Sequence, residues 1–477
     1  MKAELTLAIV WAITGWSIIT LAGLDRRRHR GVAVLVAPLV GLCITTVTAS
    51  LGLALGLGSH IELVAIVIVA ILGVAVRTVT RPELTSWLTG MGASVTLAAA
   101  TAGGIRGTVT PVLTFDSYRF IYFGRLLEAD ELDISSPVLA DYPIVGIQVQ
   151  AFGSALGAEF VIAAAAAAGV LGALGATAMI VGSNRTTQDR TGATIAIAAV
   201  AGASLALIFF VSYMLRLQLS YLNSHVMVAG LVSLAAVAAL GRLDDDDHAA
   251  VTLLSAIALA TLALARTEGA LLAAIVMLAI VSDEGLERAT WKRLAVLSVL
   301  PAAFWYARLA SGGASGDILS PERSAFMIVA MAAPMALLAI AQLDRIRRVA
   351  AWLSLIGLTV GLLGASMLEP DVFGASAAAI ASNMMTNGVW GPVWWLLGPA
   401  LLCAIVFGPL LRREEAWLLI VGGFFALVLI LGGVRDFPFR IGFGDSANRM
   451  LIHIVPLASA FVVTKVLAAA ELSEPAS

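Results

Sequence analysis

The sequence predicts an all-α polytopic membrane protein. Of its 477 residues 60% are apolar and 13% charged, whereas a soluble domain is about 45–50% apolar and about 25% charged. The mean hydropathy is +0.97, and long apolar runs recur along the whole chain. These three observations exclude a soluble enzyme, a disordered chain and a coiled coil, because none of them could hide so much apolar surface.

Net charge and cysteine content exclude further classes. The formal net charge of −2 gives no basic footprint for nucleic acid. The two cysteines, Cys43 and Cys403, both lie in apolar runs, so neither a disulfide framework nor a thiolate metal site is expected. No pattern in the sequence predicts a metal ion or a cofactor.

The apolar runs give about 15 candidate transmembrane helices, since about 20 apolar residues cross the hydrocarbon. They lie at residues 3–23, 31–55, 61–79, 86–104, 159–182, 193–213, 225–241, 249–265, 267–282, 294–309, 323–341, 350–367, 392–411, 415–432 and 450–468. The first run has no cationic region before it and no clean cleavage site, so we interpret it as a retained helix and not as a signal peptide.

Arginines in the short loops set the expected orientation, because cytoplasmic loops are enriched in Arg and Lys. Residues 25–30 read DRRRHR and should be cytoplasmic, which places the N-terminus outside. Strict alternation then places every later arginine cluster, from Arg77 to Arg413, on the same inner side. The expected location is the plasma membrane, with a short cytoplasmic tail at 469–477. The acidic run Asp244–Asp247 also falls inside, where a solvated loop is the simplest interpretation.

The longest segment between spans, residues 105–158, is predicted to lie outside. It separates a four-helix segment at 1–104 from a bundle at 159–468. Within it, residues 117–129 alternate apolar and charged side chains with helical spacing, which is typical of an amphipathic helix lying in the membrane interface. Residues 143–158 are apolar but short, and they predict a second interfacial helix. Counting them as a span would reverse every later loop against the arginine pattern.

Three outward motifs carry a resemblance to a known superfamily. Asp116 and Tyr118 precede the amphipathic helix, which is followed by a Tyr-Pro pair at 142–143 and a further apolar helix. Residues 266–269 read Arg-Thr-Glu-Gly at a helix start, and residues 444–449 read GDSANR before a last helix with His453 and Pro456. In this order they resemble the GT-C glycosyltransferases, over roughly residues 105–468. Two departures are the four helices before the Asp loop, where typical members have one, and the absence of a soluble segment after the last helix.

The resemblance implies an integral membrane glycosyltransferase. It would move a sugar from a polyprenyl-phosphate donor to a cell-envelope glycan, glycolipid or protein acceptor on the outer face of the membrane, without a cofactor. Such a reaction needs a carboxylate that accepts the proton of the acceptor hydroxyl and arginines that bind the phosphate.

The resemblance implies that Asp116 is the catalytic base, although Asp116 could also be the N-cap of the interfacial helix. Arg449, Arg266, Arg440 and His453 are the candidates for donor phosphate binding. Arginines at this depth often only extend to the interface, and His453 could serve packing or hydrogen bonding alone.

The candidates for acceptor binding or support are Tyr118, Arg119, Glu268, Glu369 and Asp371. Glu268 could pair with Arg266, or it could be a favourable charge at a helix N-terminus.

Two alternatives from other classes stay open. One is a transporter or flippase of lipid-linked saccharides, against which no internal repeat of the outward motifs is seen. The other is an outward polysaccharide polymerase or ligase, which would use an arginine and a histidine in outer loops. The loop that holds Arg216, Tyr221, Asn223 and His225 could supply them.

Overall fold

The computed structural model is all-helical over the residues that it describes. These are residues 1–24, 30–57, 60–184, 212–222, 225–243, 245–282, 288–312, 316, 318–339, 349–411 and 413–473. No strand occurs in these ranges, and an isolated parallel bridge joins Val112 to Tyr221. The all-α prediction is confirmed.

The helices follow one another with short connections. The first four are α1 (Lys2–Ala22), α2 (Arg30–Ala54), α3 (His60–Thr78) and α4 (Arg81–Thr108). The long predicted loop holds α5 (Phe115–Glu128), α6 (Val138–Asp141) and α7 (Ile144–Ala155). Then come α8 (Ala163–Ser183), α10 (Tyr213–Leu219), α11 (His225–Leu240), α12 (Asp245–Ala265), α13 (Gly269–Val281), α14 (Arg288–Ser311) and α15 (Pro321–Ala339). The last part holds α17 (Ala350–Leu368), α18 (Pro370–Ser382), the π-helix η3 (Asn383–Asn387), α19 (Val393–Phe407), α20 (Glu414–Gly433), α21 (Ser446–Met450), the 3-10 turn η4 (Leu451–His453) and α22 (Val455–Ser473).

Ten helices in the described ranges are long and apolar enough to cross a membrane. Four shorter apolar helices accompany them, namely α7, α11, α13 and α19. The expected number of about 15 is therefore not confirmed, and most of the run at 193–213 lies outside the described residues. The many apolar helices are compatible with a multi-pass membrane protein.

The centre of the bundle depends on close helix approach. A Cβ added at Gly15 of α1 would lie 1.7 Å from the Ala37 carbonyl oxygen of α2, and one at Gly41 would lie 1.9 Å from that of Trp11. The two backbones are therefore in direct contact. Small residues give transmembrane helices this contact where lipid removes the hydrophobic drive to associate.

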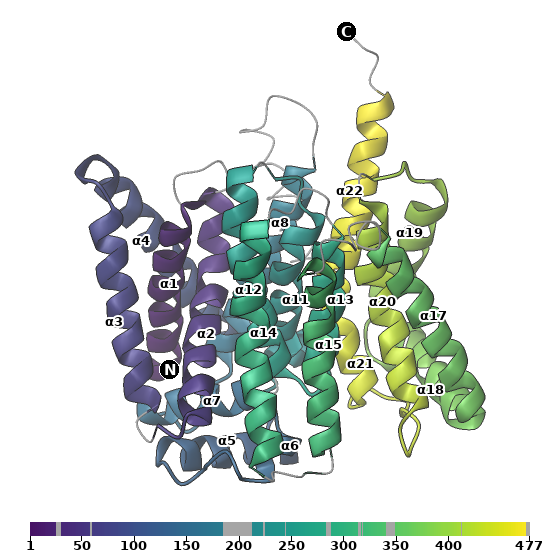
Figure 1. Ribbon diagram of the computed structural model, residues 1–477, viewed down its shortest axis with the longest axis horizontal. Helices are drawn as coiled ribbons and strands as arrows, with labels where there is room; N and C mark the ends of the chain where they lie inside the picture. The colour runs from purple at the N-terminus through teal and green to yellow at the C-terminus, as the bar shows by residue number, and fades with distance from the viewer. Residues whose placement is uncertain are drawn as a thin grey trace.

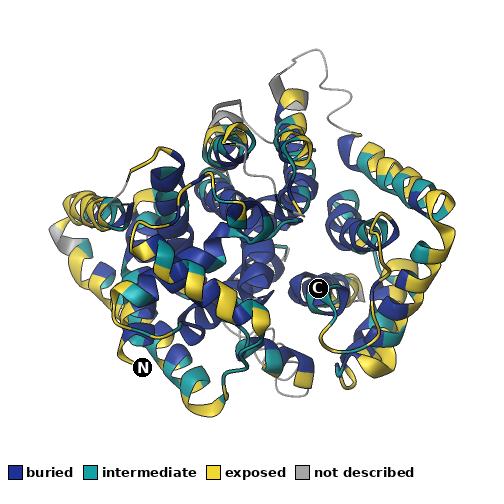
Figure 2. Cartoon of the chain, turned by 90° about the horizontal axis from the view of Figure 1, so that it is seen from below, coloured by how far each residue is buried: buried dark blue, intermediate teal, exposed yellow. Residues whose placement is uncertain are grey.

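The helices run between two ends of the bundle, and the elements of the long loop gather at one of them. In Figure 1, α5, α6, α7 and α21 lie at the lower end, while the C-terminus lies at the upper end. Figure 2 looks onto this lower end and shows exposed residues around the outside of the helices and buried ones between them. The segment at 105–158 thus forms one cap of the bundle.

This cap has two layers. Gly124 of α5 packs so closely on α7 that a Cβ there would lie 2.5 Å from the Cβ of Gln150. Nine of the twelve residues of α7 are buried, and α7 in turn contacts α2 and α12. Twelve residues extend about 18 Å, short of the about 30 Å hydrocarbon core. The helix α7 is therefore covered by α5, a burial that the sequence did not predict.

The acidic run 244–247 is placed differently from expectation. Residues from Asp245 onward begin helix α12, whereas we expected a solvated loop, and Asp244 lies outside the described residues. Acidic residues stabilise the positive N-terminal end of a helix dipole, which explains why the helix starts there.

A buried carboxylate joins the first helix to the cap region. Glu4, 2% exposed, accepts the backbone N–H groups of Ile162 (2.8 Å), Ala163 (3.1 Å) and Ala164 (2.8 Å). These are among the N–H groups at the start of α8 that have no partner within the helix. The Glu4 side chain therefore caps α8 from another helix.

Glu4→Gln should destabilise the protein by about 1–3 kcal/mol, because an amide nitrogen cannot accept these bonds and would leave buried donors unpaired. Thermal unfolding of the purified protein in detergent measures this loss. Glu62→Gln is the matched control, since Glu62 is exposed in the first turn of α3. Equal unfolding temperatures for the Glu4 variant and the wild type would contradict the capping role.

Candidate functional site

A polar cavity of about 290 Å³ opens at the lower end of the bundle. Four segments far apart in the sequence contribute to it: α5, the α6–α7 junction, the turn between α12 and α13, and α21. The charged and hydroxyl-bearing residues that line it are Asp116, Arg119, Asp141, Tyr142, Arg266, Thr267 and Arg449. Two of the three predicted phosphate-binding arginines, Arg266 and Arg449, thus share one cavity with Asp116.

Thr114, and not Asp116, caps helix α5. The Ser117 N–H donates to Thr114 Oγ1 (3.4 Å), and the Thr114 N–H donates to Ser117 Oγ (3.1 Å). Thr114 has the extended backbone that an N-cap requires. The alternative that Asp116 is the cap is therefore wrong, because the helix begins two residues earlier than the expected 117. The half-buried Asp116 side chain lies on the cavity wall.

Tyr221 ties this cap to Arg449. Its hydroxyl donates to Thr114 Oγ1 (2.9 Å), and its ring lies 5.4 Å from the Arg449 guanidinium, within the range of a cation–π contact. Nearby, the Val112 N–H donates to the Ser220 carbonyl (3.0 Å). The start of α5, the segment before α11 and α21 are thereby held together around the cavity.

Arg266 is paired with Glu268. Its Nε donates to Glu268 Oε1 (3.0 Å), while the Thr267 hydroxyl donates to Oε2 (2.9 Å). Burial raises the pKa of the Glu268 carboxyl, but the Arg266 guanidinium outweighs burial and holds this pKa well below its usual range. Glu268 therefore stays ionised and supports Arg266, which is a different role from that of a proton acceptor.

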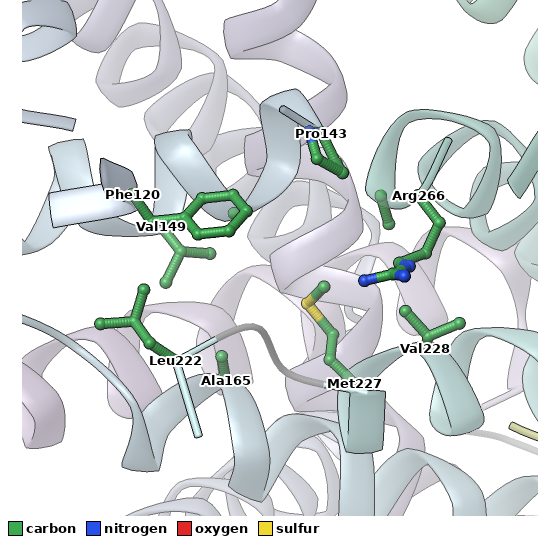
Figure 3. Close-up of a pocket in the computed structure, with 10 residues that line it drawn as sticks. Phe120, Pro143, Val149, Ala165, Leu222, Met227, Val228 and Arg266 are labelled. Carbon is green, nitrogen blue, oxygen red and sulfur yellow. The ribbon is translucent and has the colours of Figure 1, made fainter. Parts of the chain in front are cut away.

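Figure 3 shows the small pocket beside the cavity, which shares Phe120, Pro143 and Arg266 with it. The Arg266 guanidinium points into this pocket, whose other labelled side chains, such as Met227 and Val228, are apolar. A cation surrounded in this way needs a nearby anion, because an unpaired charge in an apolar site is costly. Glu268 supplies that anion.

Arg449 stands on a short helix that its neighbours hold in place. Asp445 caps α21 by accepting the Ala447 N–H (2.7 Å). Asn448 accepts from Trp390 Nε1 (2.5 Å) and donates to the Gly388 carbonyl (3.2 Å). A five-residue helix is not stable alone, so these contacts fix the position of Arg449.

His453 forms a buried pair with His225 and does not line the cavity. His225 Nδ1 and His453 Nε2 are 2.9 Å apart, and the two rings are stacked at 5.1 Å and 17°. Both side chains are 0% exposed. The outer nitrogens, His225 Nε2 and His453 Nδ1, have no partner among the described residues. The pair joins α11 to η4 at the foot of α22.

Several predicted site residues lie elsewhere. Tyr118 is 60% exposed, and its neighbour Arg119 lines the cavity instead. Arg440 is exposed, although its backbone N–H donates to Asp445 Oδ1 (2.8 Å). Glu369 and Asp371 are exposed where α17 meets α18. None of these four, Arg119 aside, lines the cavity.

Sequence reasoning assigned no role to two residues of the cavity wall. Tyr142 accepts a hydrogen bond from Arg119, and Asp141 Oδ1 accepts the Ile318 N–H (3.0 Å). Their only signal was the Asp-Tyr-Pro run in the outer loop. The Arg119–Tyr142 bond raises the pKa of Arg119 and keeps its charge at the cavity rim.

No protein-family model, no curated protein and no solved structure matches this chain. The assignment of a function therefore depends on the geometry of the cavity and on the sequence motifs.

The two histidines should be energetically coupled. His225→Ala and His453→Ala each leave one buried ring without its partner, whereas the double variant leaves none, so the double loss should be about 1 kcal/mol smaller than the sum. Thermal unfolding of the four proteins measures this coupling. His225→Ala combined with Glu62→Gln should be additive. Additivity within the histidine pair would show that the bond contributes nothing.

Proposed function

We propose that the protein is an integral membrane glycosyltransferase of the GT-C kind. It would transfer a sugar from a polyprenyl-phosphate donor to a cell-envelope acceptor at the outer face of the plasma membrane. The observation that carries this proposal is that Asp116, Arg266 and Arg449 line one cavity at one end of an apolar bundle.

The chemistry of the cavity wall suits this reaction. A phosphate is a good leaving group, so it needs positive charge more than a proton, and the two guanidinium groups offer donors in a planar fork. An attacking hydroxyl must lose its proton, which a half-buried carboxylate can accept. We assign phosphate binding to Arg449 and Arg266, and proton acceptance to Asp116. His453 and Glu268 support these arginines from behind the cavity.

An apolar groove supports a lipid-linked donor. It measures about 280 Å³ and lies between α13, α17 and α20. Leu271, Ala274, Ile275 and Leu278 line it with the spacing of one helix face. Because α13 begins directly after Arg266-Thr267-Glu268, a ligand with a phosphate head and a hydrocarbon tail would find both environments along one helix.

The polymerase or ligase alternative gains no support from the cavity. It would need Arg216 and His225 in one site, but His225 is fully buried, while Arg216 is exposed and lies 5.9 Å from the Tyr213 ring. Asn223 lies outside the described residues. For a transporter of lipid-linked saccharides, Asp116 would not be needed as a base, so the variants below also separate that alternative.

Asp116→Asn should slow transfer at least about a hundredfold, because the amide cannot accept a proton. The measurement is single-turnover transfer from a radiolabelled polyprenyl-phosphate sugar that the wild type uses. Thermal unfolding should be unchanged, since Thr114 and not Asp116 caps α5. Glu369→Gln, at an exposed carboxylate away from the cavity, is the control. Near-normal transfer by the Asp116 variant would remove this residue from the mechanism.

Arg449→Ala should weaken binding of decaprenyl phosphate at least about tenfold, because charge-assisted bonds to phosphate contribute about 1.5–3 kcal/mol each. Arg449→Lys should recover only part of the affinity, since lysine lacks the planar fork. Arg440→Ala is the matched control at an exposed arginine of the same loop. The phosphate assignment fails if the Arg449 and Arg440 variants bind the lipid equally well.

A further inference from the structure

Helix α5 carries an exposed aromatic stripe. Phe115, Tyr118 and Tyr122 are 70%, 60% and 58% exposed, and their spacing places all three on one face of the helix. Large exposed aromatic side chains grouped in this way mark interaction surfaces. The predicted membrane interface and the cavity are the two neighbours that could explain them.

The stripe faces away from the bundle. The opposite face of α5, with Phe120 and Gly124, packs on α7, and the buried α7 packs on the bundle. The helix α5 is thus the outermost layer at this end (Figure 1). Its exposed face is directed along the bundle axis toward water, and the hydrocarbon lies beside the bundle instead.

Arg119 connects the stripe to the cavity. Its guanidinium lies 4.2 Å from the centre of the Phe115 ring and donates to the Tyr142 hydroxyl. The same side chain lines the cavity together with Asp116. The aromatic stripe therefore begins at the cavity rim, one helical turn or less from the carboxylate.

The ligand of such a stripe must come from the aqueous side and must offer both apolar faces and hydroxyl groups. Sugar rings have this chemistry: their C–H faces stack on aromatic rings, while their hydroxyls bond to tyrosine and arginine. The distance from Phe115 to Tyr122 along the helix is about 10 Å, enough for more than one ring of an extended chain.

We propose that Phe115, Tyr118 and Tyr122 bind an extended carbohydrate chain, which makes the acceptor a glycan. This inference rests on the proposed function, because it places the acceptor hydroxyl at Asp116. It adds the class of the acceptor and the surface that holds it.

The first experiment asks what the stripe faces. The full chain with Cys403→Ser is placed in nanodiscs, and a fluorophore is attached to Tyr118→Cys or, as a lipid-facing control, to Val360→Cys, which replaces an exposed apolar residue of α17. Iodide in the buffer should quench the label at position 118, and doxyl groups on the lipid chains should quench the label at position 360. Strong doxyl quenching at position 118 would make the stripe a bilayer anchor and overturn the proposal.

The second experiment measures glycan binding directly. Linear hexasaccharides of mannose, glucose and xylose serve as probes in calorimetry with the full chain in nanodiscs. At least one should bind, and the combined variant F115A/Y118A/Y122A should weaken that binding at least about tenfold. Tyr213→Ala, at a 54% exposed tyrosine of α10, should bind like the wild type. Binding of none of the probes, or equal binding by the combined variant, would overturn the proposal.

Asp116→Asn separates this proposal from the proposed function. It should keep wild-type affinity for the hexasaccharide while losing transfer. Loss of glycan binding with transfer intact would refute the stripe alone. Glycan binding in a protein whose Asp116 variant transfers normally would refute only the catalytic assignment.

Discussion

The constraint on which the structure depends is that charge inside an apolar bundle must be paired or placed at its ends. Arg266 satisfies it through Glu268 at 3.0 Å, and Glu4 through three backbone N–H groups of α8. At the other end, Lys465 satisfies it through Glu414 at 2.7 Å. Each of these groups also joins elements that are distant in the sequence or in the bundle, so the pairing of charge and the packing of helices are the same set of contacts.

At the lower end the same constraint produces the cavity. The turn at Arg266-Thr267-Glu268 and the short helix α21 each bring a guanidinium group to the place where α5 ends the apolar region. Arg449 is held by Asn448 and by the Tyr221 ring, and Tyr221 in turn bonds to the residue that caps α5. The carboxylate of Asp116 and the two arginines are therefore fixed by one network. This preorganisation is what transfer from a charged donor requires.

Much of this arrangement could be predicted from the sequence. Apolar runs gave the helices, and three motifs singled out Asp116, Arg266 and Arg449, which the structure brings to one cavity. The His225–His453 bond and the Glu4 cap could not be predicted, because they join residues 228 and about 160 positions apart. Exposed Glu369 and Asp371 show the opposite limit. A loop on the predicted outer side can supply charge without reaching the cavity, since helix packing and not sequence order decides which loops meet.

The most direct test of this account is the position of a bound polyprenyl phosphate. Electron cryomicroscopy of the full chain in nanodiscs with decaprenyl phosphate would locate it. The account predicts phosphate density within hydrogen-bond distance of both Arg266 and Arg449, with the hydrocarbon chain directed to the groove between α13, α17 and α20. Phosphate density away from both arginines, or at the end of the bundle that holds Lys465, would contradict it.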